Sequence, residues 1–224
     1  MAKFLRIALW NANGLYPHNE EVKLFLNQNY IDVFLISEMH FTDRTHCSIP
    51  QYNIYYTNHP DATAHTGTAV IIRQTISHNE LSSFQQDYLQ AMSVNVTLLP
   101  YKLTISAIYC PPKHNNKEQH FIAFFKRMGP KFLVGGDFNS KHTQWGARTT
   151  TTKGRELLKV VEQNKYNVLS TANPTYWPPD PQKIPDIAPT PPCNNKHNRA
   201  PSTTHVHLED IRKSSTKDTW PPIL

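Results

Sequence analysis

The chain has 224 residues, and 23 Lys and Arg against 17 Asp and Glu give it a formal charge of +6. This length is enough for one sizeable hydrophobic core and does not require a second domain. The mild positive charge permits a polyanionic partner without demanding one. No segment approaches the roughly 20 apolar residues of a membrane span, so we expect no membrane partner. The three scattered cysteines favour a reducing compartment over a disulfide framework.

The first third of the chain contains segments with a strand pattern and one segment with a helix pattern. Residues 5–10 form an apolar strand, and residues 17–28 carry apolar side chains at helical spacing. Residues 31–37 are almost continuously apolar, as in a strand that is buried on both faces. Residues 52–57 and 67–73 are rich in residue types that favour strands. We therefore expect a strand, a helix and three further strands in that order.

The middle of the chain predicts an antiparallel pair of strands, followed by two helices with a strand between them. Apolar and polar residues alternate over residues 92–98 and again over 103–109, as in two paired strands with one face on the core. Four segments follow in order: a helix carrying Phe121, Phe124, Phe125 and Met128 on one face, a buried strand at 132–134, a helix at 153–164 and a short strand at 166–170.

Strands outnumber helices in this pattern, which predicts an α/β fold. We expect a layered sandwich of two mainly antiparallel or mixed β-sheets flanked by helices. The composition then changes, because eleven of the 18 prolines lie at or after Pro174 and no glycine follows Gly154. We expect one domain over residues 1–187 and a Pro-rich, disordered tail over residues 188–224, since its few apolar side chains cannot offset the entropy lost on ordering.

Polar side chains follow four of the predicted strands at the point where each strand ends. They are Asn11, Glu38, Tyr109, and Asp137 together with Asn139. Two carboxylates and nearby amide oxygens suit Mg²⁺, whose shell substrate phosphate often completes. Each residue also has a purely structural interpretation: Asn11 as a turn residue, Tyr109 as a half-buried strand residue, and Gly-Gly-Asp-Phe-Asn as a turn with an Asx hydrogen bond. The residues alone leave both interpretations open.

Four segments together resemble a known family. They are Trp-Asn-Ala-Asn-Gly-Leu at 10–15, Ile-Ser-Glu-Met-His at 36–40, Ile-Tyr-Cys-Pro-Pro at 108–112, and Gly-Gly-Asp-Phe-Asn-Ser-Lys-His at 135–142 with Trp145 and Gly146. Their order and spacing resemble the endonuclease/exonuclease/phosphatase family over about residues 4–187. The most similar branch is the apurinic-endonuclease-like domain that begins the reverse-transcriptase polyprotein of jockey-type non-LTR retrotransposons.

The resemblance implies a role for each polar residue. Asn11 would position the metal or the scissile phosphate, and Glu38 would bind Mg²⁺, with Mn²⁺ as an alternative ion. Tyr109 would hydrogen-bond the phosphate. Asp137 would align or deprotonate the attacking water, and Asn139 would hold the water and the phosphate in place. The metal set implied by the resemblance is thus Glu38 with Asn11.

Three further positions are connected to the family pattern. His142 belongs to the retrotransposon variant of the motif and is expected to contact DNA. Asp186 closes a Lys-Ile-Pro-Asp segment that resembles the same lineage, but the family continues there into a core strand, whereas this chain continues into a Pro-rich segment. The family ends on a Ser-Asp-His motif, which this sequence lacks, and Asp218 is the residue that comes nearest to its Asp position.

The resemblance implies that the chain hydrolyses a phosphodiester bond in double-stranded DNA. The nick would leave a 3′-hydroxyl primer for the reverse-transcriptase domain of the parent polyprotein, which is absent from this chain, and the site of action would be nuclear. Without Ser-Asp-His, the alternative is a catalytically inactive remnant that at most binds DNA or another protein. A phosphomonoesterase or phospholipase on the same fold is a third reading, because a fold does not set the substrate.

Two groups of residues in the sequence carry soft metal ligands and are candidates for a zinc site. They are His40, His46 and Cys47, and the pair His205 and His207. Neither group has the spacing of a structural zinc site, so we do not expect zinc there.

Overall fold

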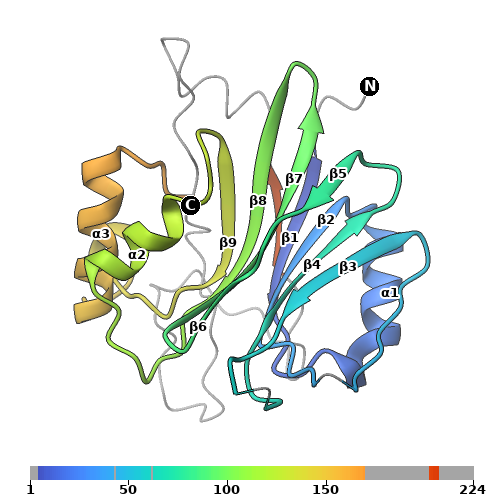
Figure 1. The fold of residues 1–224 in the computed structure, drawn as a ribbon, viewed down its shortest axis with the longest axis horizontal. Helices are drawn as coiled ribbons and strands as arrows, with labels where there is room; N and C mark the ends of the chain where they lie inside the picture. The colour runs from blue at the N-terminus through green and yellow to red at the C-terminus, as the bar shows by residue number, and fades with distance from the viewer. Residues whose placement is uncertain (1–4, 43, 62, 170–201, 207–224) are drawn as a thin grey trace, which may run out of the picture.

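The computed structural model describes residues 5–42, 44–61 and 63–169 and the backbone of residues 202–206. Within these ranges the chain forms two five-stranded β-sheets that pack face to face, with α-helices on both outer sides (Figure 1). The expected fold class, a layered α/β sandwich of mixed sheets, is therefore confirmed.

The first sheet contains both the N-terminal strand and the last described strand. Its order is β10 (Ser202–Val206), β1 (Leu5–Asn11), β2 (Val33–Ser37), β4 (Thr68–Arg73) and β3 (Tyr52–Thr57). Strands β1 and β2 are parallel, and the other neighbouring strands are antiparallel. Because β1 and β2 run in the same direction, Asn11 and Ser37 are register partners at their carboxyl ends.

The second sheet is built around a long antiparallel pair. Its order is β5 (His78–Glu80), β7 (Leu89–Leu98), β8 (Tyr101–Tyr109) and β9 (Phe132–Asp137), and β6 (Phe84–Gln86) also pairs with β7. Strands β8 and β9 are parallel, which makes Tyr109 and Asp137 register partners. Both sheets thus contribute two parallel strands whose carboxyl ends carry the polar residues singled out above.

The space between the sheets is filled by apolar side chains from alternate positions of the strands. From the first sheet these are Leu5, Ile7, Val33, Leu35, Val70 and Ile72, and from the second sheet Met92, Val94, Val96, Leu103, Ile105, Ala107 and Leu133. Burial of this area is the main term that holds the sheets together, at roughly 25 cal/mol per Å² of apolar surface removed from water. The continuous apolar pattern of β2 arises because its other face is covered as well.

Three α-helices cover the outer faces in the described part of the chain. Helix α1 (Asn19–Gln28), preceded by the 3₁₀ turn η1 (Tyr16–His18), packs Val22 and Leu26 against the first sheet. Helices α2 (Glu118–Phe125) and α3 (Thr152–Asn164) cover the second sheet on the opposite side (Figure 1). None of the described helices is both long and apolar enough to cross a membrane.

Most of the expected elements are present, and the differences are local. The segment 166–170 was predicted as a strand, but Asn167 makes only an isolated bridge, and this prediction is wrong. Strands β5 and β6 were not predicted, because each has only three residues, which are too few to show a strand pattern. The sequence also predicted no strand after residue 187, whereas β10 pairs with β1. The rest of the 188–224 segment lies outside the described residues, and the domain boundary at 187 stays a prediction.

Gly136 in β9 stands where no other residue fits. Its φ of +146° lies in a region that side-chain-bearing residues rarely adopt, and a Cβ atom there would meet the Ile108 carbonyl oxygen and lie 2.9 Å from Ser37 Oγ. The absence of a side chain therefore allows β9 to approach β8 and β2 closely, immediately before Asp137.

We predict that Gly136→Ala lowers the free energy of unfolding by about 2–5 kcal/mol, from backbone strain and overpacking together. Gly129→Ala is the matched control, because Gly129 also has a positive φ (+74°) but open space around the added Cβ. The control is expected to cost only about 1–2 kcal/mol. Urea unfolding measures both values, and an equal loss in the two variants would contradict the close approach of the strands.

Candidate active site

Asn11 connects two carboxylates that belong to different sheets. Its Nδ2 atom donates to Glu38 Oε1 at 3.0 Å and to Asp137 Oδ2 at 3.1 Å. Asn11 ends β1 and Glu38 directly follows β2 in the first sheet, whereas Asp137 ends β9 in the second. Residues that are 126 positions apart in the sequence are thereby joined, which the ends of parallel strands make feasible. Glu38 and Asp137, singled out in the sequence as polar residues at strand ends, are therefore brought together through Asn11.

Asn139 completes the same cluster from the loop after β9. Its backbone N–H donates to Asp137 Oδ1 at 2.8 Å, which closes an Asx turn, and its Nδ2 donates to the Cys110 carbonyl at 3.2 Å. The first of these bonds and the bond from Asn11 together hold both carboxylate oxygens of Asp137. The structural interpretation of the motif, an Asx turn, is therefore confirmed, and the catalytic roles of Asp137 and Asn139 stay predictions.

Tyr109 lies beside the carboxylates and keeps its proton. Its side chain is buried, and burial is the largest cause that raises the pKa of the hydroxyl far above its ordinary value. The charge of Glu38, a hydrogen bond to Glu38 and the charge of Asp137 raise the pKa further. The hydroxyl is thus a hydrogen-bond donor at neutral pH, which is the form that a phosphate oxygen would need.

The backbone around the cluster is strained. Four residues without the freedom of glycine have positive φ: Asn13 (+44°), Glu38 (+54°), His40 (+56°) and Asn139 (+47°). Such conformations cost on the order of 1–3 kcal/mol each and gather at functional sites. The loops after β1 and β2 hold each other in these conformations, because the Gly14 N–H donates to the Glu38 carbonyl at 2.8 Å.

Ser37 is a residue that sequence reasoning missed. Its hydroxyl is 1% exposed, donates to the Ile108 carbonyl at 2.9 Å, and accepts from the Asp137 N–H at 3.1 Å. It therefore joins β2 to β8 and β9 directly below the carboxylates. No signal in the sequence pointed to it, since a serine at the end of a buried strand has many structural explanations.

Lys153 was missed for a similar reason. It was assigned only to the start of a helix, but its side chain is 4% exposed and its Nζ atom donates to the Pro111 carbonyl at 2.8 Å. Burial lowers the pKa of Lys153, while the charges of Cys110 and Asp137 act in the opposite direction. The positive charge of Lys153 in turn acts to lower the pKa of Asp137, against the larger effect of burial.

Asp137 is harder to ionise than an ordinary carboxyl. Burial is the largest cause that raises its pKa, and the negative charge of Glu38 raises it further. Hydrogen bonds from Asn139 and Asn11 act in the opposite direction and lower it. A carboxyl with a raised pKa in a cluster with a second carboxylate is typical of a site that handles protons or a cation.

The donor set fits a hard divalent cation. Glu38 and Asp137 place two carboxylates beside one amide group, and their mutual repulsion would be relieved by an ion between them. Asn11 directs its Nδ2 atom at these carboxylates, while its Oδ1 accepts from the Asn13 N–H at 3.2 Å. Asn11 would therefore have to turn its carboxamide to bind a metal, and its role as a ligand stays a prediction. His40 Nε2 lies 3.9 Å from Glu38 Oε2.

His142, the other predicted residue that the structure describes, has no hydrogen bond to this cluster among the described residues. His142 caps the 3₁₀ turn η2 (Thr143–Trp145): its Nδ1 accepts from the Gln144 N–H at 3.1 Å, and its ring packs on Trp145. Its expected contact with DNA stays a prediction. Asp186 and Asp218 lie outside the described residues, so their predicted roles remain untested.

Comparison with known proteins shows which family has this arrangement. A family profile described as endonuclease-reverse transcriptase matches residues 103–210. The RNA-directed DNA polymerase from mobile element jockey of Drosophila melanogaster is 34% identical over 181 residues, which are 81% of this chain and 20% of the relative. A probable RNA-directed DNA polymerase from transposon BS, from the same species, is 32% identical over 183 residues, again 81% and 20%.

The chain belongs to the endonuclease/exonuclease/phosphatase family. Members of this family are nucleases and phosphodiesterases, and endonucleases of this fold typically depend on a divalent metal ion. The chain spans about a fifth of the length of the curated relatives it matches. The profile match extends to residue 210, past the boundary at 187 that the composition indicated.

Solved structures show the same fold. The endonuclease domain of TRAS1, a telomere-specific non-LTR retrotransposon, superposes with a TM-score of 0.57 at 17% identity, covering 71% of this chain and 72% of that one. The AP endonuclease LMAP from Leishmania major superposes with a TM-score of 0.53 at 8% identity, covering 72% and 67%. The family fold that the sequence motifs implied is thereby confirmed.

We predict that the Asp137 carboxyl titrates above its ordinary pKa of 3.8, and that Glu38→Gln lowers this pKa by removing a neighbouring negative charge. Because the folded chain then binds this proton more tightly than the unfolded chain does, the associated stability is present at low pH and lost as the pH rises through the raised pKa. Carboxyl NMR titration measures the shift. Glu80→Gln, at an exposed position in β5, is the control, and an equal effect of both changes would contradict the coupling.

Proposed function

We propose that this chain provides the nicking site of a retrotransposon polyprotein, which hydrolyses one phosphodiester bond of double-stranded DNA with Mg²⁺ and leaves a 3′-hydroxyl. The single observation that carries the proposal is the bridge from Asn11 to Glu38 and Asp137, since it assembles a carboxylate pair at the strand ends of both sheets. The family and the named endonuclease relatives support the reaction class.

Asp137 and Asn139 are proposed to prepare the attacking water. Asp137 is anchored by three hydrogen bonds: its backbone N–H donates to Ser37 Oγ, and its two carboxylate oxygens accept from Asn139 and Asn11. A fixed carboxylate can align a water molecule and accept its proton as the oxygen attacks phosphorus. The raised pKa makes Asp137 a better proton acceptor than an ordinary aspartate once it is ionised.

Glu38 is the proposed main metal ligand, with Mn²⁺ as an alternative to Mg²⁺. A bound divalent ion would supply charge stabilisation to the phosphate and to the departing 3′ oxygen. Tyr109 would donate its hydroxyl hydrogen to a phosphate oxygen, and its high pKa keeps that hydrogen in place. Each of these side chains is already restrained by protein contacts, so little reorganisation is needed when substrate binds.

The cellular context follows from the relatives. The similar proteins are RNA-directed DNA polymerases of mobile elements, about five times as long as the matched segment. The proposed partners are therefore double-stranded DNA and a reverse-transcriptase domain of the same polyprotein, which would extend the 3′-hydroxyl. Chromosomal DNA as the target implies action in the nucleus.

One observation favours a second function, that of an inactive DNA-binding remnant. The sequence contains no Ser-Asp-His, the motif whose His in this family would stabilise the charge on phosphate. Loss of one such donor typically costs about 10²–10³ in rate. Misplacement of the remaining groups by about 1 Å can cost on the order of 10²-fold more. If the two losses multiply, the rate falls by roughly 10⁴ or more.

A supercoiled-plasmid assay with Mg²⁺ decides between these functions. We predict nicking close to background for the chain as given, and a rise when a family-like strand carrying Ser-Asp-His is fused in frame. Asp137→Ala should abolish the restored activity, because it removes the group that aligns the water.

Robust nicking by the unfused chain that Asp137→Ala abolishes would show that the missing motif matters less than estimated. Failure of the fused chain to nick, combined with retention of duplex DNA in a binding assay, would favour the remnant. Release of inorganic phosphate from a monoester by the same chain, sensitive to Asp137→Ala, would favour a phosphomonoesterase.

We predict that Mg²⁺ binds weakly to the free chain, because Glu38 would be its main carboxylate ligand and phosphate normally completes the shell. Glu38→Ala should weaken this binding at least about tenfold, as calorimetric titration would show. Glu80→Ala removes an exposed carboxylate elsewhere and should leave the titration unchanged. Identical titrations for the parent and Glu38→Ala would exclude Glu38 as the ligand.

A further inference from the structure

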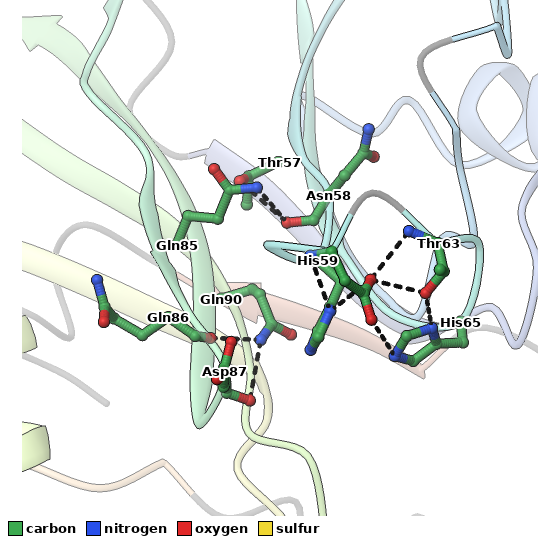
Figure 2. A network of polar contacts seen from close by, with 10 residues as sticks. Thr57, Asn58, His59, Thr63, His65, Gln85, Gln86, Asp87 and Gln90 are labelled. Atoms are coloured by element: carbon green, nitrogen blue, oxygen red, sulfur yellow. Dashed lines mark hydrogen bonds and ion pairs between the residues drawn. The ribbon is translucent and has the colours of Figure 1, made fainter.

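A second group of potential metal ligands lies in the loop between β3 and β4. Nitrogen atoms of His59 and His65 and a carboxylate oxygen of Asp61 all lie within 4.8 Å of one another. His59 Nδ1 is 2.7 Å from Asp61 Oδ1, and His65 Nε2 is 4.0 Å from Asp61 Oδ2. We refer to these three residues as the loop cluster. Figure 2 shows the His59 and His65 side chains converging in this loop.

Thr63 prepares two members of the loop cluster for a metal. Its hydroxyl donates to Asp61 Oδ1 at 2.7 Å. The lone pairs of the Thr63 hydroxyl oxygen can then accept a hydrogen bond from His65 Nδ1–H, with which this oxygen is in contact. A proton on Nδ1 leaves the lone pair on His65 Nε2, the atom that faces Asp61. Metal-binding histidines in proteins are held in this way by a partner on the other ring nitrogen.

Asp61 is charged over the whole physiological range. Hydrogen bonds from the Thr63 hydroxyl and backbone are the largest causes that hold its pKa well below the usual value, and a hydrogen bond and the charge of His59 act in the same direction. A carboxylate and two imidazoles form a ligand set of one oxygen and two nitrogens. Zn²⁺ and other borderline divalent ions favour such sets, whereas Mg²⁺ favours oxygen alone.

The geometry is close to that of a bound ion. In a tetrahedral site with metal–nitrogen distances of about 2.0–2.1 Å, ligand atoms lie about 3.3 Å apart. The separation of 2.7 Å from His59 Nδ1 to Asp61 Oδ1 and that of 4.0 Å from His65 Nε2 to Asp61 Oδ2 lie on either side of this value. Asp61 and His65 are about half exposed, which leaves a path for the ion and a position for water.

His59 offers an independent observation. Its side chain is 6% exposed, and within the described residues neither its Nε2 atom nor the Oε1 atom of buried Gln90 has a hydrogen-bond partner. In Figure 2 the Gln90 side chain lies on the side of the His59 ring away from Thr63 and His65. A metal on Nδ1 requires the proton to be on Nε2, which would turn Nε2 into a donor for an acceptor such as Gln90 Oε1.

The β3–β4 loop, which carries the loop cluster, is hydrogen-bonded to the second sheet and to the residues after Glu38. The Asn58 carbonyl accepts from Gln85 Nε2 of β6 at 3.0 Å, which ties the start of the loop to the second sheet. At its other end the Thr66 and Gly67 carbonyls accept from the backbone N–H groups of His40 and Met39, the residues that follow Glu38. An ion in the loop would therefore restrain the backbone beside the proposed catalytic metal ligand.

We propose that His59, Asp61 and His65 form a binding site for one Zn²⁺-like divalent ion, separate from the Glu38 site, with water as a fourth ligand. The role of this ion is structural: it holds the β3–β4 loop in the conformation that supports the backbone after Glu38. The site uses nitrogen ligands and would therefore discriminate against Mg²⁺.

The test uses the untagged chain after removal of metal with a chelator. Zn²⁺ is titrated by calorimetry, and Co²⁺ by the visible absorption bands that report a low coordination number. We expect one equivalent to bind, and Asp61→Asn and His65→Gln each to weaken binding by on the order of 10–100-fold or more. Thr63→Val keeps the side-chain shape but removes the hydroxyl, and should weaken binding by about 10-fold.

Two matched controls separate this site from others. His46→Gln removes an exposed histidine from a different loop, and Glu38→Gln removes the proposed Mg²⁺ ligand; both should bind Zn²⁺ as the parent does. Hydrogen exchange supplies a second readout, because Zn²⁺ should slow exchange at the Met39 and His40 amides. Absence of saturable binding, or binding unchanged by Asp61→Asn and His65→Gln, would reduce the cluster to a hydrogen-bonded ion pair. Loss of binding in Glu38→Gln would place the ion in the active site instead.

Discussion

The hydroxyl of Ser37 connects the two sheets at the point where the active site begins. It donates to the Ile108 carbonyl of β8 and accepts from the Asp137 N–H of β9, while Ser37 itself belongs to β2 in the other sheet. Without it, two buried backbone groups would lose a partner, at about 1–3 kcal/mol for each unsatisfied group. The contact requires glycine at position 136, because a Cβ atom there would collide with the Ile108 carbonyl oxygen and lie only 2.9 Å from Ser37 Oγ. The position of Asp137 relative to the first sheet depends on this pair of residues.

The cluster above Ser37 is an arrangement of like charges that protein contacts hold together. Asn11 donates both of its described Nδ2 bonds to carboxylates, while burial and the charge of Glu38 raise the pKa of Asp137. A bound cation reverses this electrostatic balance, because it favours the ionised form of each carboxylate. Glu38 and Asn139 both have positive φ, and the Asn139 backbone N–H donates to Asp137 Oδ1.

Two kinds of metal chemistry are separated within a short distance along the chain. The active site offers carboxylate and amide oxygens, whereas the loop cluster of His59, Asp61 and His65 offers two nitrogens and one oxygen. Ligand type selects the ion in each place, since hard Mg²⁺ and borderline Zn²⁺ prefer different donors. The backbone bonds between the β3–β4 loop and the residues after Glu38 provide a physical connection between the two.

The sequence by itself determined the family, the layered architecture and the five polar residues that gather at the strand ends, because strand periodicity and the order of short motifs are local properties. The pairing of β7 with β8 and the limits of β3 were also readable in this way. The features that depend on contacts between segments distant in the sequence were decided by the tertiary structure alone. The contacts of Ser37 and Lys153 are with other strands and loops, which their own segments do not indicate. Strands β5, β6 and β10 form by hydrogen bonding to neighbouring strands, although their own sequences show no strand pattern. The loop cluster was missed because its spacing, His-x-Asp-x-x-x-His, has no fixed meaning until the loop folds back and brings the three side chains together.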